Sequence, residues 1–390
     1  MNSLVWAEID LNAISHNICE LRRITDTKAM LMAAVKANAY GHGAQQVASH
    51  ALKNGADRLG VANINEAISL RNKGIKAPIL IFGYTPCQSA HFLAEFDLTQ
   101  AVHSYETALS LSSAVLSLGK SIKIHLKVDT GIGRLGFLQI NDNSLPLLKE
   151  ECKKTVNEAL SISRLKGIEL EGIFTHFATA DFFDKSYAKA QFCRFMDFID
   201  AVKRAGVVPQ LLHAANSAAL IDMPETHLDM VRPGISIYGL YPSDEIDKTR
   251  VDLKPAMTLK TKIIHLKKVP AGFKISYGIT YETKNPTTIA TVPIGYADGF
   301  NRLLSSRGFM LVNGSRAPVV GRVCMDLTML DVGHIPDVGL EDEVVVIGRQ
   351  KEECISADEI AAATNTINYE VVTSIGARAE RVYKGLVEGY

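Results

Sequence analysis

The first 240 residues alternate short apolar runs with amphipathic segments, and this alternation restricts the fold more than any other feature of the chain. It is typical of repeated βα units around a parallel sheet. Eight runs read as strands: Leu31–Val35, Arg58–Val61, Pro78–Phe82, Leu98–Val102, Ile122–Val128, Gly172–Thr175, Gln210–His213 and Leu228–Val231. Helical patterns lie between them, such as Gln45–Asn54, Ile64–Asn72 and Gln191–Ala205. Eight parallel strands close a barrel, and no Gly-x-Gly-x-x-Gly follows the first strand as a doubly wound sheet would need. We therefore predict an α/β fold, a (β/α)8 TIM-type barrel.

The pattern changes near residue 245, and a chain of 390 residues is long enough for two domains. Strand-like runs separated by turn signals follow: Met257–Val269, Lys274–Tyr281, Thr288–Ile294, Phe309–Val312, Ala317–Asp326 and Glu343–Ile347. We predict a barrel over residues 1–244 and a β-rich C-terminal domain over residues 245–390. A further strand, about residues 4–9, precedes Asp10 as the N-cap of a helix. We expect this first strand to pair with the second domain.

The charge and cysteine content excludes several classes of protein. The formal net charge is zero, with 42 basic and 42 acidic residues and no run of five or more like charges, which disfavours nucleic acid and acidic membranes as partners. The six cysteines have neither the close pairing of a metal site nor the density of a disulfide scaffold. No apolar stretch reaches about 18 residues, and the N-terminus lacks an export signal. We expect a cytoplasmic protein with no metal centre and no membrane partner.

One lysine stands out at the end of the first barrel strand. Lys36 ends an apolar run and is followed by small residues, Tyr40 and the turn Gly41-His42-Gly43. An ammonium that loses hydration at such a place has a lowered pKa, and the neutral amine can form a Schiff base with an aldehyde such as pyridoxal phosphate. A lysine in such a run is also commonly a side chain that reaches to solvent, so the residues alone leave both interpretations open.

Other polar residues also lie at predicted strand ends, where the chemistry of a barrel gathers. Arg134, His176 and Arg232 follow their strands closely. Alternation along Ile122–Asp129 puts Lys127 and Asp129 on one face, where a satisfied internal ion pair is the simplest interpretation. A lone histidine at a strand end is most often a core or capping residue. Asn216 and Ser217 fit either a helix cap or a phosphate site, and a tyrosine in a strand, such as Tyr277, is usually part of the packing.

The string Val35–Gly43, Val-Lys-Ala-Asn-Ala-Tyr-Gly-His-Gly, resembles the cofactor-lysine signature of bacterial alanine racemases. Further matches recur along nearly the whole chain: Lys127–Arg134, Val231–Ile235, Ile275–Gly278, Ile294–Gly299, Gly321–Asp326 and Asn368–Glu370. The resemblance implies a pyridoxal-phosphate-dependent isomerase that interconverts L- and D-alanine and supplies D-alanine for peptidoglycan. It also implies a homodimer with shared active sites.

The resemblance further implies roles for the residues of the barrel. Lys36 would form the aldimine with the cofactor and act as one catalytic base. Arg232 would contact the pyridine nitrogen, and His176 would link Arg232 to the catalytic tyrosine. Lys127 would be a candidate for carbamylation, and the carbamate would orient Arg134 toward the cofactor and the substrate. The residues implied to bind the cofactor phosphate are Tyr40, Ser217, Gly234, Ile235 and Tyr369.

In the second domain, the resemblance makes Tyr277 the other catalytic base, reaching the cofactor of the neighbouring subunit. Inversion at the α-carbon removes a proton from one face and delivers one to the other, which two bases do most simply. The residues implied to lie near the substrate carboxylate, with Arg134, are Tyr296, Met325 and Asp326. Arg302 is expected to shape the entrance.

Three alternatives remain open at this level. A broad-specificity amino-acid racemase would share the same motifs. Non-catalytic pyridoxal-phosphate-binding proteins of the same barrel family lack a second domain, whereas Tyr277 and Met325 lie in one here. Decarboxylases of similar architecture usually place a carboxylate at the pyridine nitrogen, which Arg232 argues against. One departure from the family is the segment 141–164, which is longer than usual and reads as a solvated helix.

Overall fold

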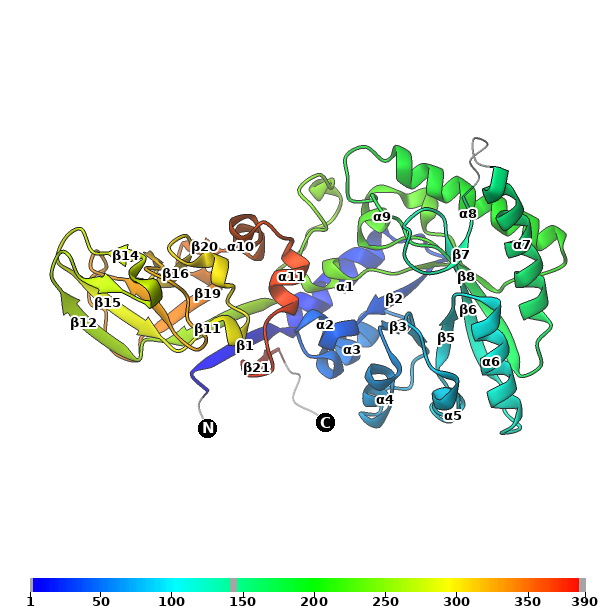
Figure 1. Ribbon diagram of the computed structural model, residues 1–390, viewed down its shortest axis with the longest axis horizontal. Coiled ribbons are helices and arrows are strands. Elements are labelled where there is room, and N and C mark those ends of the chain that lie inside the picture. Colours follow the sequence, from blue (N-terminus) through cyan, green and yellow to red (C-terminus); the bar gives the residue numbers. More distant parts are fainter. Residues whose placement is uncertain (1–2, 141–145, 386–390) are drawn as a thin grey trace. The chain divides into compact units, whose positions relative to one another are not determined.

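The computed structural model describes residues 3–140 and 146–385. The chain forms two compact units (Figure 1). The barrel unit comprises Ala13–Ala39 and Ala44–Lys254, and the β-rich unit comprises Met1–Asn12, Tyr40–Gly43 and Pro255–Tyr390. The first residues of the chain and the short segment after Lys36 therefore belong with the C-terminal part.

Eight strands of the barrel unit pair in parallel and form a nearly closed barrel (Figure 1). In pairing order from β10 they are β10 (Met230–Val231), β2 (Met30–Ala34), β3 (Arg58–Val61), β4 (Ile79–Ile81), β5 (Thr99–Val102), β6 (Ile122–Asp129), β8 (Ile168–Phe174) and β9 (Leu211–His213). The backbone bonds Asp229 N→Leu212 O (3.0 Å) and Arg232 N→Ala215 O (2.9 Å) join the segments of β9 and β10. The predicted fold class is confirmed, and each of the eight predicted strands overlaps an observed one.

The barrel helices begin where the sequence supplies caps. Asn63 accepts a hydrogen bond from Glu66 N at the start of α4 (Ile64–Asn72), and Ser104 caps α6 (Tyr105–Leu116) in the same way. The other helices associated with the barrel are α1 (Leu11–Ile24), α3 (Ala44–Lys53), α5 (Ala90–Glu95), α7 (Pro146–Ser163), α8 (Ser186–Arg204) and α9 (Ser217–Asp222). The long segment singled out in the sequence contains α7, while its residues 141–145 lie outside the described part of the chain.

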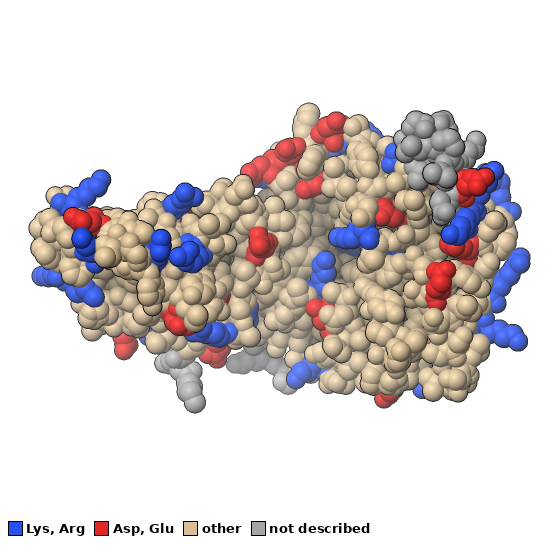
Figure 2. All heavy atoms as spheres, viewed as in Figure 1, with Lys and Arg blue, Asp and Glu red and all other residues tan. Residues whose placement is uncertain are grey.

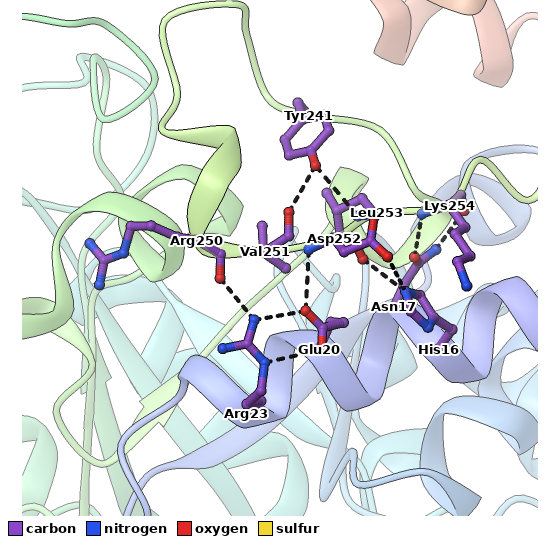
Figure 3. A network of polar contacts seen from close by, with 10 residues as sticks. All are labelled: His16, Asn17, Glu20, Arg23, Tyr241, Arg250, Val251, Asp252, Leu253 and Lys254. Carbon is purple, nitrogen blue, oxygen red and sulfur yellow. Dashed lines mark hydrogen bonds and ion pairs between the residues drawn. The ribbon is translucent and has the colours of Figure 1, made fainter.

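A polar network on α1 fixes the segment that ends the barrel unit (Figure 3). Asn17 donates to Ile237 O (3.1 Å) and Lys254 O (2.9 Å), and accepts from Lys254 N (2.8 Å). Arg23 donates to Glu20 and to the carbonyl of Arg250 (2.9 Å). The buried amide of Asn17 thus satisfies backbone groups that a chain leaving the barrel would otherwise expose unpaired.

The barrel lumen is filled by side chains rather than open. Met32, Leu80, Ala101, Phe174 and Met230 come from five strands and form one buried apolar cluster. Packed layers of this kind are the normal core of such barrels. The cluster makes the barrel a rigid support for polar groups at the strand ends.

The β-rich unit is built on a mixed sheet in which the N-terminal strand is an interior strand beside the edge. β1 (Val5–Asp10) pairs antiparallel with β11 (Met257–Lys262) and parallel with β21 (Glu380–Lys384). The sheet continues through β19 (Glu343–Gln350), β16 (Phe309–Val312) and β17 (Ser315–Pro318), and β20 (Glu353–Ile355) pairs with β19. A second sheet contains β12 (His265–Val269), β15 (Thr287–Val292) and β18 (Thr328–Asp331), and α10 (Ala357–Thr364) and α11 (Asn368–Thr373) are the helices of the C-terminal segment.

Three predicted runs of this unit differ from the structure. The run 257–269 is two strands, β11 and β12. The run 274–281 is a hairpin of β13 (Lys274–Ile275) and β14 (Tyr281–Glu282), and a turn separates its two strands. The run 317–326 leaves this sheet after Pro318. Gly321 then has φ +73°, and a Cβ there would lie 2.9 Å from Ile275 O.

Lys and Arg side chains are interspersed with Asp and Glu over the face shown in Figure 2. Among the described residues, no helix is both long and apolar enough to cross a bilayer.

Candidate active site

Lys36 lies two residues after the end of β2 and precedes a turn with an uncommon backbone. Residues 37–40 all have φ between 51° and 54°, the left-handed region that L residues enter at a cost of about 1–2 kcal/mol each. Gly41 and Gly43 continue it with φ of +84° and +97°. Backbone strain of this kind persists where the surroundings enforce it, and it concentrates at functional sites.

Neighbouring groups hold this turn in place. Ala37 N donates to the carboxylate of Glu66 (2.8 Å), and Ala44 N donates to the side chain of Asn38 (2.9 Å). Burial lowers the pKa of Lys36, the charge of Arg134 lowers it further, and Glu66 opposes both effects. The Lys36 amine is therefore shifted toward its neutral, nucleophilic form.

The loop after β6 is organised by one carboxylate. Asp129 Oδ1 accepts from the backbone N–H groups of residues 131, 132 and 133 at 2.9, 2.9 and 3.2 Å, and Oδ2 accepts from Arg134 N at 2.9 Å. Gly136 allows the loop to turn back, since a Cβ there would lie 2.7 Å from Lys127 O. The loop is thereby fixed to the strand end, with the Arg134 side chain exposed.

Lys127 is buried beside this loop. Within the described residues it forms no ion pair with a carboxylate. The oxygens of Asp129 accept from backbone N–H groups instead, so the Lys127–Asp129 ion pair expected as the simplest interpretation is not formed. The ammonium lies 5.9 Å from the ring of Phe174. Burial, with Arg134 and Arg232 nearby, lowers the pKa of Lys127 to about 8.

Arg232 is a second buried basic residue of the site, with 5% of its surface exposed. Its Nη2 donates to Thr175 O (2.7 Å) and Ala214 O (3.0 Å) and lies 3.4 Å from His176 Nδ1, and Nη1 lies 2.9 Å from His213 Nδ1. Burial lowers its pKa to about 9, so the guanidinium stays protonated at neutral pH.

His176 is half-buried beside the guanidinium, and desolvation together with the charges of Arg232 and Arg134 holds its pKa well below the usual range. Its neutral imidazole joins four basic side chains at the strand ends: Lys36, Lys127, Arg134 and Arg232. Concentrated positive charge of this kind favours an anionic ligand.

The turn between β10 and the next helical segment offers hydroxyl and backbone groups. Ser217 Oγ accepts from Gly234 N (2.8 Å), which brings the start of α9 against residues 234–236. Ser236 Oγ is buried and has no hydrogen-bond partner within the described residues. A buried hydroxyl without a partner is costly, and a ligand oxygen such as that of a phosphate would relieve the cost.

The other candidates lie in the β-rich unit. The rings of Tyr40 and Tyr369 are 6.2 Å apart, and burial raises the pKa of Tyr40 to about 12, so its phenol remains a hydrogen-bond donor. Tyr277 lies in a turn, residues 277–279, rather than in a strand, and 72% of its surface is exposed. Ser276 before it has φ +66° and donates to Arg322 O (2.6 Å).

Several apolar or aromatic side chains around this turn are exposed as well. The set comprises Tyr277, Ile279, Tyr296, Met325 and Leu327. Asp326 forms an ion pair with Arg378 (2.8 Å), and a cavity of about 440 Å³ in this unit is lined by residues that include Tyr296 and Arg302. Exposed apolar side chains in such number are typical of a surface that another molecule covers.

The sequence profile of the alanine racemase N-terminal domain matches residues 9–242, and that of the C-terminal domain matches residues 256–383. The chain belongs to the alanine racemase family. The chain is 56% identical to an alanine racemase of Desulfosudis oleivorans over 97% of this chain and 96% of that one, and 50% identical to one of Methanococcus maripaludis over 97% and 98%.

Solved structures agree with this assignment. An alanine racemase of Clostridium difficile superposes with a TM-score of 0.91 at 40% identity, over 98% of this chain and 96% of that one. An alanine racemase of Bartonella henselae, described with covalently bound pyridoxal phosphate, gives a TM-score of 0.85 at 26% identity, over 98% and 100%. The family expected from the motifs, and its class as an isomerase, are confirmed.

The barrel unit of this racemase-family chain brings together Lys36, Lys127, Arg134, His176, Ser217, Arg232, Gly234 and Ile235. The β-rich unit holds Tyr40, Tyr277, Tyr296, Arg302, Met325, Asp326 and Tyr369. Sequence reasoning missed one buried group behind Arg232, formed by Arg58, His125 and Glu171. The predicted strand began at Gly172 and so left out Glu171, although an acidic residue inside an apolar run was a signal that could have found it.

Proposed function

We propose that this chain interconverts L- and D-alanine, using pyridoxal phosphate bound covalently through Lys36, and that the D-alanine serves peptidoglycan synthesis. The observation that carries the proposal is the Lys36 amine. Lys36 lies just before a left-handed turn at the end of β2. Burial and the charge of Arg134 lower the pKa of its amine.

The residues present fit the cofactor. Arg232 Nε has no hydrogen-bond acceptor within the described residues, although the rest of the guanidinium is anchored, so this N–H is available to the pyridine nitrogen. Tyr40, Ser217, Gly234, Ile235 and Tyr369 would bind the phosphate; the buried hydroxyl of Ser236 supports a polar ligand there. When bound, pyridoxal phosphate withdraws electrons from the α-carbon of the amino acid.

Arg134 would contact the cofactor's phenolic oxygen and the substrate. A carbamate on Lys127 would hold the guanidinium of Arg134 by charge-assisted hydrogen bonds. The lowered pKa of Lys127, to about 8, supports this modification, because carbon dioxide reacts with the neutral amine. Tyr296, Met325 and Asp326 of the partner subunit would line the site near the substrate carboxylate, and Arg302 would shape its entrance.

Two bases on opposite faces of the α-carbon would exchange its proton. Lys36 serves one face as a neutral amine. Tyr277 of the partner subunit serves the other, with neutral His176 between that phenol and Arg232. The exposed surface around Tyr277 supports a homodimer with shared sites.

Arg232 also restricts the reaction to racemisation. A guanidinium does not give up its proton at working pH, so Arg232 would donate a hydrogen bond to the pyridine nitrogen without protonating it, and the ring would withdraw fewer electrons than beside a carboxylate. Arg232 would thereby favour return of the proton to the α-carbon over transamination. This same feature disfavours an amino-acid decarboxylase.

The experiment is deuterium incorporation from heavy water into L- and D-alanine by the loaded protein. Lys36→Ala should abolish incorporation from both enantiomers and remove the borohydride-trapped adduct. Tyr277→Phe should keep the adduct and lose incorporation from the enantiomer whose α-proton faces that phenol. Lys203→Ala, on the exposed face of α8, and Tyr105→Phe, at the start of α6, serve as matched controls.

Incorporation retained in both Lys36→Ala and Tyr277→Phe would refute the assignment. A loaded protein that traps the cofactor yet exchanges no amino acid would identify the non-catalytic alternative. Equal exchange with serine and larger amino acids would identify a broad-specificity racemase. We also propose that the protein acts in the cytoplasm.

A further inference from the structure

Strand β8 carries a buried carboxylate that the proposed reaction does not use. Glu171 is 3% exposed. The pairing of β6 with β8 shifts register at this point, from Ile124 opposite Leu170 to His125 opposite Gly172, so Glu171 is the extra residue of a bulge. Bulges are uncommon in parallel pairs and re-aim side chains.

Two kinds of partner meet this carboxylate. Arg58 donates from both terminal nitrogens, Nη1 to Oε2 at 2.9 Å and Nη2 to Oε1 at 3.0 Å. His125 Nε2 lies 2.9 Å from Oε2. Lys123, 45% exposed at its side chain, is a weaker neighbour at 3.7 Å. Arg58 and His125 together hold Glu171 in its ionised form, as an acceptor.

A line of hydrogen bonds leads from this carboxylate to Arg232. His125 Nδ1 lies 2.7 Å from His213 Nε2, and His213 Nδ1 lies 2.9 Å from Arg232 Nη1. His125 and His213 are fully buried, and both have pKa values below the usual range because burial disfavours the imidazolium. Each neutral ring then has one donor nitrogen and one acceptor nitrogen.

The carboxylate selects one arrangement of these protons. Since Glu171 only accepts, His125 Nε2 carries a proton and His125 Nδ1 does not. His213 Nε2 must then donate to His125, which leaves His213 Nδ1 unprotonated. That nitrogen accepts from the guanidinium of Arg232. The opposite arrangement would place two acceptors against each other at Glu171 and two donors against each other at Arg232.

The packing around the His125 and His213 rings restricts their orientation. A Cβ at Gly172 would lie 2.7 Å from the His125 ring, so glycine at the bulge leaves the space that the ring fills. The His213 ring stacks on Phe174, with centroids 4.8 Å apart and planes 5° apart. Both imidazoles are thus held in the orientation that joins the two ends.

We propose that Glu171 is a positioning residue for Arg232: through His125 and His213, its carboxylate keeps an acceptor nitrogen against the guanidinium and so fixes the N–H groups offered to the cofactor. A carboxylate that sets the tautomer of an imidazole is an established way to orient a site. This inference rests on the proposed function, because that function supplies the cofactor that Arg232 would contact.

The first test is nitrogen NMR of the full chain labelled at histidine, with and without pyridoxal phosphate. In the wild type, His213 Nδ1 should give the signal of an unprotonated nitrogen, with Nε2 protonated. Peaks are assigned with His213→Asn. A protonated Nδ1 in the wild-type protein would overturn the proposal, and this measurement depends on neither catalysis nor the folding of any variant.

The second test uses Glu171→Gln, which keeps the size of the side chain and removes its charge. Its amide can donate to His125 Nε2, which permits the opposite tautomers of His125 and His213. We expect a second His213 signal and pyridoxal phosphate affinity weakened by about tenfold or more, as for other groups that orient a site indirectly. Lys123→Gln removes a charge beside the same carboxylate but outside the line, and should leave the His213 signal and the affinity unchanged.

Unchanged His213 tautomer and affinity in Glu171→Gln would refute the positioning role. An equal loss of affinity in Lys123→Gln would also refute it, because a general charge effect would then explain both variants. Failure of the proposed function would appear differently, as a wild-type protein that does not racemise alanine although the His213 signal has the expected form.

Discussion

Asp129 offers the sharpest test of how the site is held together. Asp129→Asn keeps one acceptor oxygen, which can still accept from the backbone of residues 131–133. It replaces Oδ2 by an amide that points a donor at Arg134 N, where the wild type has a 2.9 Å bond. A lost hydrogen bond to a buried charged group costs about 1.5–3 kcal/mol. The three remaining bonds also lose their charge assistance. We therefore expect the loop to be destabilised by about 2–3 kcal/mol, a factor of roughly 30–150 in its opening equilibrium.

The assay is hydrogen exchange of the amides of residues 131–134, together with kcat/KM for alanine. Exchange of the Arg134 amide should accelerate by that factor, and kcat/KM should fall by about tenfold or more because the guanidinium is no longer held. Asp26→Asn is the matched control, since Asp26 caps an exposed turn through one bond to Lys28 N (2.8 Å). Exchange and activity at wild-type levels in Asp129→Asn would show that the carboxylate does not organise the loop.

Three further outcomes are expected. Because the pKa of Lys127 is lowered to about 8, its neutral fraction grows as pH rises through 8; carbamylation from labelled bicarbonate should rise with it, and Lys127→Arg should show no carbamate signal. Gly136→Ala combines φ +132° with a 2.7 Å backbone clash and should cost about 2 kcal/mol or more in unfolding free energy, while Gly206→Ala, at φ +93° in open space, should cost about 1. Ser276→Ala should lower kcat several-fold by loosening Tyr277 and leave cofactor affinity unchanged; unchanged kcat would argue against the anchor at Arg322 O.

Local patterns in the sequence were enough for the barrel and for its strand-end residues. Apolar runs of the right length were interrupted by helical periodicity, and each run matched an observed strand. Residues just after such runs must lie at one end of the barrel, because all the strands are parallel. Lys36, Arg134, His176 and Arg232 could therefore be grouped before any coordinates were known.

The C-terminal domain was harder to predict because turns there depend on contacts between distant residues. The sequence predicts a strand that contains Tyr277, because nearby residues such as Ile275 and Ile279 are β-prone. The structure puts it in a turn, where Ser276 is held at φ +66° by a bond to the carbonyl of Arg322, 46 residues later. Such a constraint leaves no periodic signal in the local sequence.

The order of residues by itself determined the barrel, the β-rich second part and the lysine at the end of the first barrel strand, because burial patterns and strand lengths are local properties. Only the tertiary structure decided that the carboxylates of Asp129 and Glu171 would organise the site. Asp129 accepts hydrogen bonds from the backbone N–H groups of a loop. Glu171 is connected to Arg232 by hydrogen bonds through two imidazoles. Hydrogen bonds join atoms in space, and their partners here come from β3, β6, β8, β9 and the segment after β10, which no pattern within a single segment could have related.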